Sequence, residues 1–196
     1  MNQLLGKRVR SVLIGLLTGF LLLTCIPAIS HGTDFPEEKL GKVQLEGMWE
    51  EVRLQRYLDL ENGYVFYYDL ERLKRVEDEQ KAKFVPIHPL PEPYPEVSLT
   101  IERVDLSPQE LTSRKYEELV SSYGEVENPR EIEDPNGWFL FAHGEDWDSE
   151  VLEYYIVSDG KKGSYLITSK FFVSAYEGWG QRLHAMVKEF MIIPQR

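Results

Sequence analysis

Ser164-Tyr-Leu-Ile-Thr-Ser-Lys-Phe-Phe-Val173, together with the residues that follow it, decides the fold of this chain. The stretch is rich in aromatic and β-branched side chains, which favours a β-strand. Shortly after it, apolar side chains recur on one helix face: Trp179, Leu183, Met186, Val187 and Phe190. A strand and an amphipathic helix joined by so short a link must fold back on each other, because each has an apolar face to bury.

The residues before this stretch predict an antiparallel meander. Strands are expected over residues 131–133, 138–142 and 151–157, where β-branched and aromatic side chains are frequent. Asn136-Gly137 supplies the turn between the first two of these strands, and Asp159-Gly160 supplies the turn between the third and residues 164–173. The carboxyl-terminal half is therefore expected to be a set of strands that ends in a helix.

A hairpin opens the first half of the domain. Residues 51–59 and 64–69 flank Asn62-Gly63, and both of these residues tolerate the positive φ that a type I′ turn requires. Residues 97–104 alternate between apolar and polar side chains, which indicates a half-buried strand.

A capped helix follows that strand. Ser107, Pro108 and Glu110 form a capping box with Pro at the first helical position, and Gly124 is expected to end the helix. Its predicted buried stripe comprises Leu111, Tyr116, Leu119, Val120 and Tyr123.

Between the hairpin and this strand lie two stretches of unusual composition. Residues 70–83 are dense in charge and are expected to form a short exposed helix or a loop. Five prolines between residues 86 and 95 forbid a helix and a strand ladder. They predict a stiff, extended connection across one edge of the sheet, with a Pro-rich docking ligand as the alternative.

The amino terminus has the pattern of an export signal over residues 1–30. A basic leader precedes an uncharged, Leu-rich run, and Ala28 and Ser30 occupy the positions that signal peptidase reads. The alternatives are an uncleaved anchor or a lipid on Cys25, because the residues before Cys25 resemble a bacterial lipobox, although Thr24 departs from its pattern. Residues 31–48 are expected to form a flexible tether, and residues 49–193 a single domain. We expect an extracytoplasmic location: secreted, periplasmic or anchored at the outer face of the membrane.

Charge narrows the choice of partners. The first 30 residues hold three of the 22 Lys and Arg and none of the 33 Asp and Glu, so the rest of the chain carries 19 minus 33, or −14. So acidic a domain has no obvious means of binding phosphate backbones, and nucleic acid is excluded as an expected partner. Contact with a membrane is expected only through an uncleaved signal or a lipid. Cations and basic protein surfaces are the partners that electrostatics favours.

The order of elements resembles the PsbP family of extrinsic proteins of the oxygen-evolving complex and their bacterial envelope relatives. Asn62-Gly-Tyr-Val-Phe-Tyr-Tyr68 is similar to the Tyr-rich second strand of the family's opening hairpin. Gly180-Gln-Arg-Leu-His-Ala-Met-Val-Lys-Glu-Phe190 is similar to its closing helix. The resemblance implies an α+β fold in which two main helices pack an antiparallel sheet of about five to seven strands. It concerns architecture, and it favours an accessory, partner-binding role.

Candidate catalytic and metal sites are few. Four His residues are present, at 31, 88, 143 and 184, and the last is expected at the surface or boundary of the terminal helix. The chain contains no hydrolase, P-loop, zincin or dinucleotide-binding motif. Weak candidates for ligands of a hard cation such as Ca²⁺ are His143, Glu145, Asp146 and Asp148. No cofactor is expected.

Aromatic side chains on the predicted strands are the remaining feature. If helices cover only one face of the sheet, part of this set lines an exposed partner surface, with Tyr64, Phe66, Tyr68 and Trp138 as candidates. The alternative is that both faces are covered and these residues form the core.

We therefore expect a non-enzymatic accessory domain of the cell envelope that binds another protein. The alternative is a carrier of a small apolar ligand in a cleft between sheet and helix, and an uncharacterised enzyme is third. A closed cavity lined by Tyr and Phe would indicate the carrier. A buried His beside a carboxylate would indicate the enzyme.

Overall fold

The computed structural model describes residues 35–78 and 80–194. The chain divides into two compact units, residues 1–32 and 33–196, and only the second is described below. The predicted signal peptide and Cys25 lie outside the described residues. None of the helices in the described part is long and apolar enough to cross a membrane.

A four-stranded antiparallel sheet opens the domain. Its order is β1-β2-β3-β12, so the last strand of the chain pairs with the hairpin near its start. The strands are β1 (Glu38–Leu45), β2 (Met48–Asp59), β3 (Tyr64–Asp69) and β12 (Met191–Ile192).

An eight-stranded antiparallel sheet forms the rest of the β structure. Its order is β4-β5-β6-β11-β10-β9-β7, and β8 pairs with β9 beside β7. The strands are β4 (Leu73–Val76), β5 (Ala82–Pro86), β6 (Ser98–Val104), β7 (Glu125–Val126), β8 (Arg130–Glu133), β9 (Asn136–His143), β10 (Glu150–Ser158) and β11 (Ser164–Phe172).

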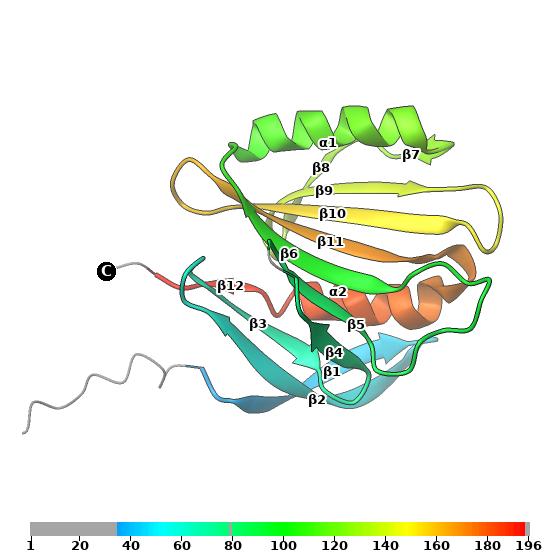
Figure 1. Cartoon of the computed structure of the whole chain (residues 1–196), viewed down its shortest axis with the longest axis horizontal. Helices are drawn as coiled ribbons and strands as arrows, with labels where there is room; N and C mark the ends of the chain where they lie inside the picture. The colour runs from blue at the N-terminus through cyan, green and yellow to red at the C-terminus, as the bar shows by residue number, and fades with distance from the viewer. Residues whose placement is uncertain (1–34, 79, 195–196) are drawn as a thin grey trace, which may run out of the picture. The chain divides into compact units, whose positions relative to one another are not determined.

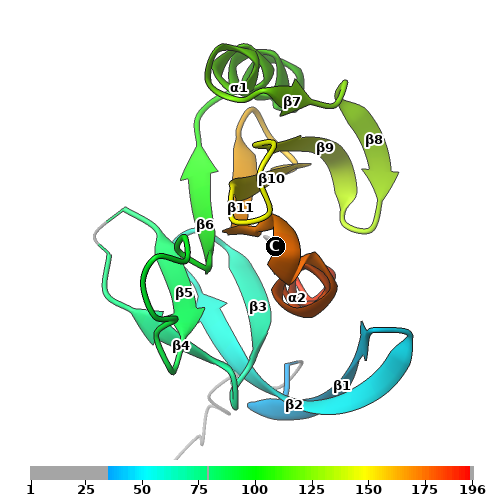
Figure 2. The same ribbon diagram turned by 90° about the vertical axis from the view of Figure 1, so that its right-hand side faces the viewer.

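The two α-helices lie on opposite faces of this larger sheet (Figure 1). Helix α1 (Pro108–Ser122) covers β9 and β10, and Leu152 and Ile156 of β10 point to it. Helix α2 (Gln181–Val187) lies on the other face, between the larger sheet and β1 to β3 (Figure 2). Two hydrophobic cores result, because successive side chains of a strand point to opposite faces.

The predicted α+β class is confirmed, and so is the pairing of the terminal helix with the strand before it. Leu183 and Phe190 are buried in the main core, whereas Trp179 is only half-buried. The helix begins later than predicted, because residues 176–180 form a π-helical turn. With twelve strands in two sheets, the described part of the chain has more strands than the five to seven expected.

Two segments predicted to lack strands form them. The tether predicted over residues 31–48 is wrong for residues 38–48, which form β1 and the start of β2. The charge-dense stretch at 70–83 contains β4 and the start of β5. Strands β1 and β4 are edge strands of their sheets, and each has only one fully buried residue. Their apolar alternation is therefore weak.

Both Asn-Gly turns differ from the prediction. Asp59 pairs with Tyr64, so a four-residue loop closes the β2–β3 hairpin, and Gly63 is the residue there with a positive φ, 76°. The type I′ turn is therefore wrong. On β9, Asn136 already pairs with Glu133 across a turn at residues 134–135. Gly137 serves a different purpose, because a Cβ there would lie 2.2 Å from the carbonyl oxygen of Ile156.

The N-cap of α1 at Ser107 is confirmed. The hydroxyl of Ser107 accepts a hydrogen bond from the amide of Glu110 at 3.3 Å. The carboxylate of Glu110 pairs with Arg114 in place of completing the predicted capping box, and the C-cap is Tyr123.

The predicted buried stripe of α1 is partly wrong. Leu111 and Leu119 are buried as expected, but Val120 is exposed. Val120 lies about 100° around the helix from Leu119 and so points away from the sheet.

Candidate functional site

The predicted aromatic partner surface is not on the surface. Tyr64 and Phe66 are fully buried, and Tyr68 and Trp138 are half-buried. The physical reason is that β3 is covered on both faces. Phe84 of β5 packs on Phe66 and Tyr68, and α2 packs on the other face. The alternative in which these residues form the core therefore holds for Tyr64 and Phe66.

The four predicted metal ligands do not converge. The Nδ1 atom of His143 lies 2.7 Å from the carbonyl oxygen of Gly144, and its Nε2 lies 3.3 Å from Glu125. Within residues 35–78 and 80–194, no group of three His, Cys, Asp or Glu side chains could hold a metal ion. In the acidic loop between β9 and β10, Glu145 and Asp146 are exposed and Asp148 is half-buried.

A buried polar chain joins β10 to α2. The hydroxyl of Tyr155 donates a hydrogen bond to Oε2 of Glu153 at 2.8 Å and lies 2.9 Å from Nδ1 of His184. Burial raises the pKa of Glu153 to about 7 and raises that of Tyr155 well above 10, while burial lowers the pKa of His184. When Glu153 is ionised, Tyr155 donates to it, so the Nδ1 atom of His184 must carry the proton that it shares with Tyr155.

These three residues differ from the buried His beside a carboxylate that would indicate an enzyme, because His184 is half-buried and reaches Glu153 only through Tyr155. Only 4% of Glu153 and 1% of Tyr155 are exposed. Sequence reasoning placed His184 at a helix boundary, which agrees with its half-buried position, but missed its partners. The available signal was Glu153 itself, a charged residue at an inward position of an otherwise apolar strand.

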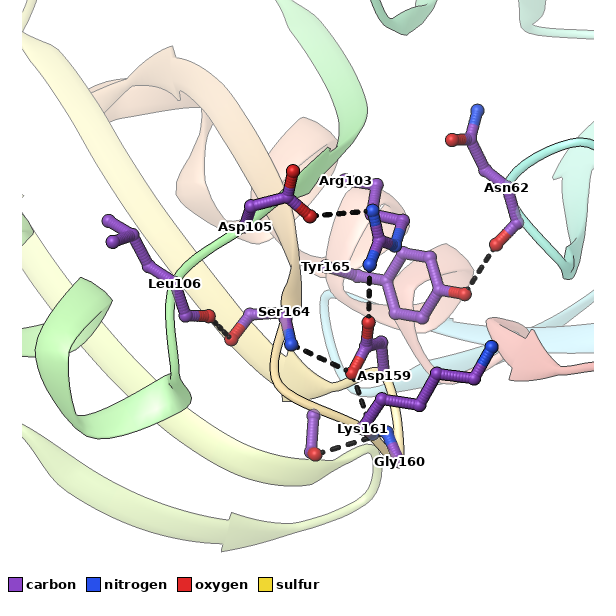
Figure 3. Close-up of polar contacts among 11 residues, drawn as sticks. Asn62, Arg103, Asp105, Leu106, Asp159, Gly160, Lys161, Ser164 and Tyr165 are labelled. Atoms are coloured by element: carbon purple, nitrogen blue, oxygen red, sulfur yellow. Dashed lines mark hydrogen bonds and ion pairs between the residues drawn. The ribbon is translucent and has the colours of Figure 1, made fainter.

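A second polar cluster fixes the β10–β11 turn (Figure 3). Asp159 accepts hydrogen bonds from the guanidinium of Arg103 at 2.8 Å and from the amides of Lys161 and Gly163 at 2.8 and 3.0 Å. Burial alone would raise the pKa of Asp159, but these bonds lower it. The carboxylate therefore stays ionised and its acceptor sites are occupied by the turn.

Two further bonds tie neighbouring loops to this turn (Figure 3). The hydroxyl of Ser164 donates to the carbonyl of Leu106, and the hydroxyl of Tyr165 donates to the carbonyl of Asn62. A cavity of about 700 Å³ adjoins the turn, and its lining contains carboxylates but no Lys, Arg or His. The cluster thus holds three loops together and offers no nucleophile with a base.

Exposed aromatic side chains gather where the Pro-rich segment meets the β9–β10 loop. Tyr94 stacks on Phe172 with ring centroids 5.0 Å apart and makes an edge contact with Trp147 at 6.2 Å. Phe172 is buried, whereas 38% of Tyr94 and 58% of Trp147 are exposed. We call the surface formed by Tyr94, Trp147 and Phe172 the aromatic patch. Sequence reasoning missed it because its members come from three separate segments.

The loop that carries Trp147 is held to the end of β11. The amide of Ser174 donates to the carbonyl of Trp147 at 2.8 Å, and the amide of Val173 donates to the carbonyl of Ser149 at 3.1 Å. The exposed indole of Trp147 is therefore attached to a fixed backbone. The adjacent ring of Tyr94 stacks on Phe172.

An apolar groove of about 350 Å³ adjoins the aromatic patch and shares Tyr94 with it. It lies between the β4–β5 hairpin and the Pro-rich segment. Its apolar lining residues are Val76, Val85, Pro86, Pro89, Leu90, Tyr94, Pro95 and Val97. The Pro-rich segment is therefore one wall of a groove as well as a connection.

Fold and site together define an α+β domain with two antiparallel sheets and an exposed aromatic patch. No family model matches this chain, and no curated protein matches it. Among solved structures, it is similar to cyanobacterial PsbP from Synechocystis sp. PCC 6803, with 11% sequence identity and a TM-score of 0.46. The likeness covers 71% of this chain and 92% of that chain. At this identity it concerns the fold alone.

Proposed function

We propose that this chain is an exported, non-enzymatic accessory domain of the cell envelope that binds a protein partner. The observation that carries the proposal is the aromatic patch. The patch exposes two aromatic rings side by side on a fixed backbone, and Tyr and Trp are enriched in the residues that dominate protein interfaces. Export is proposed from the leader-like pattern of the first 30 residues.

The alternatives have weaker support. The apolar groove contains one aromatic side chain, Tyr94, and so differs from the Tyr- and Phe-lined cavity expected of a carrier. The buried chain of Glu153, Tyr155 and His184 has the residue types of an active site, but two of its three members are sealed from solvent. Partner binding requires neither a cavity nor a reactive group.

The test is a capture experiment on the envelope fraction with matched variants. Immobilised wild-type protein is compared with Trp147→Ser and Tyr94→Ser, and bound proteins are identified by mass spectrometry. We expect at least one protein to be enriched by the wild type and lost with both variants, because each removes a ring from the aromatic patch.

The control is Leu60→Ser. Leu60 is more exposed than Trp147 and Tyr94, at 67%, but lies in the β2–β3 loop. It should retain the same protein. If Leu60→Ser loses the protein together with the patch variants, or if the patch variants retain it, the proposed function is wrong.

A further inference from the structure

We infer that the aromatic patch binds an extended segment rich in Arg or Lys on the partner protein. The inference rests on the proposed function and names the chemistry of the partner. It follows from what surrounds the two exposed rings.

Carboxylates flank the aromatic patch and are not neutralised. Asp146 and Asp148 lie on either side of Trp147, and Glu92 lies two residues before Tyr94. None of the three forms an ion pair with another described residue. The loops at 87–97 and 144–149 contain no Lys or Arg. The two loops that carry the exposed rings are therefore acidic, as is the domain as a whole, and Lys74 and Glu96 contribute one charge of each sign to the adjoining groove.

Arg is the side chain that best satisfies both features. Its guanidinium stacks on the face of Trp or Tyr by a cation–π contact. The same group donates hydrogen bonds to a carboxylate beside the ring. An acidic or purely apolar partner would leave Asp146 and Asp148 unpaired beside the interface, which opposes binding.

The site is also pre-organised for an extended chain. The backbone bonds from Ser174 and Val173 fix the Trp147 loop, so little conformational entropy is lost when a partner binds. The apolar groove continues from Tyr94 and can take an apolar side chain of the same segment. A basic segment with an apolar residue near its cations therefore fits the whole surface.

The test uses synthetic peptides and the full chain of 196 residues. A fluorophore-labelled peptide of alternating Arg and Leu is titrated with protein, and binding is followed by fluorescence anisotropy. The matched peptides carry citrulline, which has the shape of Arg without its charge, or Glu. We expect the Arg peptide to bind, the citrulline peptide to bind at least fivefold more weakly, and the Glu peptide not to bind.

Variants show whether binding occurs at the aromatic patch. We expect Trp147→Ser to lower the affinity for the Arg peptide at least fivefold, and the double variant Asp146→Asn with Asp148→Asn to do the same. The control is the double variant Glu131→Gln with Glu133→Gln on the exposed strand β8, which changes the net charge equally and should bind as the wild type does. Asp146, Glu131 and Glu133 are exposed and Asp148 is half-buried. An unchanged melting temperature verifies that the variants fold.

The inference fails if the Arg and citrulline peptides bind equally, or if the β8 control weakens binding as much as the Asp146 and Asp148 variant. In that case a partner captured through Trp147 still supports the proposed function. If no partner depends on Trp147 but the Arg peptide binds at the aromatic patch, the inference stands as a binding property and the proposed function fails.

Discussion

At the residue scale, Glu153 makes the stability of the domain depend on pH. Its pKa is raised by burial from 4.5 to about 7, so the folded state holds its proton more tightly than the unfolded state. The stability that this proton contributes is present in full below pH 4.5 and is lost as the pH rises to about 7. A shift of this size corresponds to about 3 kcal/mol in the free energy of unfolding, as an order of magnitude.

Glu153→Gln removes this titration. As the pH rises from 5 to 8, we expect the free energy of unfolding of the variant to increase relative to that of the wild type. The reason is that only the wild type must bury an ionised carboxylate at pH 8. Urea unfolding at the two pH values measures the difference. Glu133→Gln on the exposed strand β8 is the control, and it should change nothing with pH. If the free energies of unfolding of the variant and the wild type differ by the same amount at both pH values, the raised pKa of Glu153 is contradicted.

Arg182 is the second residue with a large expected effect. Its side chain is buried and forms ion pairs with the buried Asp69 of β3 and, at 2.9 Å, with Glu50 of β2. It therefore joins α2 to the smaller sheet. Arg182→Met leaves Asp69 buried beside an apolar group, and breaking a buried pair in this way costs about 3–5 kcal/mol.

The matched control is Arg53→Met. Arg53 also pairs with a glutamate, Glu38, at 2.8 Å, but both side chains are exposed. Such exposed pairs contribute little to the free energy of unfolding, because solvent and salt screen them. Chemical denaturation of the two variants compares them directly. If Arg182→Met and Arg53→Met lower the free energy of unfolding by similar amounts, Arg182 does not hold α2 in place.

At the element scale, Gly137 allows β9 to approach β10. A Cβ at this position would lie 2.2 Å from the carbonyl oxygen of Ile156, which belongs to the backbone and cannot turn aside. Gly137→Ala should therefore shift the strands apart and destabilise the domain by about 1–3 kcal/mol. Gly178→Ala is the control, because nothing lies within 4 Å of the added methyl group. Thermal unfolding of both variants measures the effect, and equal melting temperatures would contradict the close approach.

The same scale shows which elements the sequence could predict. Strand β6, helix α1 with its Ser107 cap and the β10–β11 pair were predicted, because each has its own apolar rhythm or cap. Strand β1 was not predicted. Of its eight residues, only Val43 is fully buried, and the strand exists because β2 pairs with it.

At the scale of the whole molecule, the domain begins before residue 49. Val43 is buried in the main core, and Lys39 lies over the ring of Tyr67 at 4.1 Å and pairs with Glu189. A chain that starts at residue 33 should fold with normal stability. A chain that starts at residue 49 lacks β1, so the edge of β2 loses its hydrogen-bonding partner and the core loses Val43; its melting temperature should fall well below the longer chain's. Circular dichroism during heating distinguishes the two, and equal values would restore the predicted boundary.

The candidate site belongs to this scale as well. Tyr94, Trp147 and Phe172 are far apart along the chain, and nothing near any of them indicates that their rings meet. Tyr64 and Phe66 had the stronger local pattern for an aromatic surface, but the fold buries them under Phe84 and α2. Exposure of an aromatic ring depends on every layer that packs over it, and strand alternation describes only one layer.

The sequence by itself determined the α+β class, the strand and helix at the carboxyl end, the capped helix after Ser107 and the acidity of the domain. These follow from local periodicity and composition, because each element needs one face for the core. Only the tertiary structure decided that β1 exists, that Glu153 and Tyr155 meet His184, and which aromatic rings reach solvent. Those outcomes depend on contacts between segments that are distant in the chain, and local sequence patterns do not indicate such contacts.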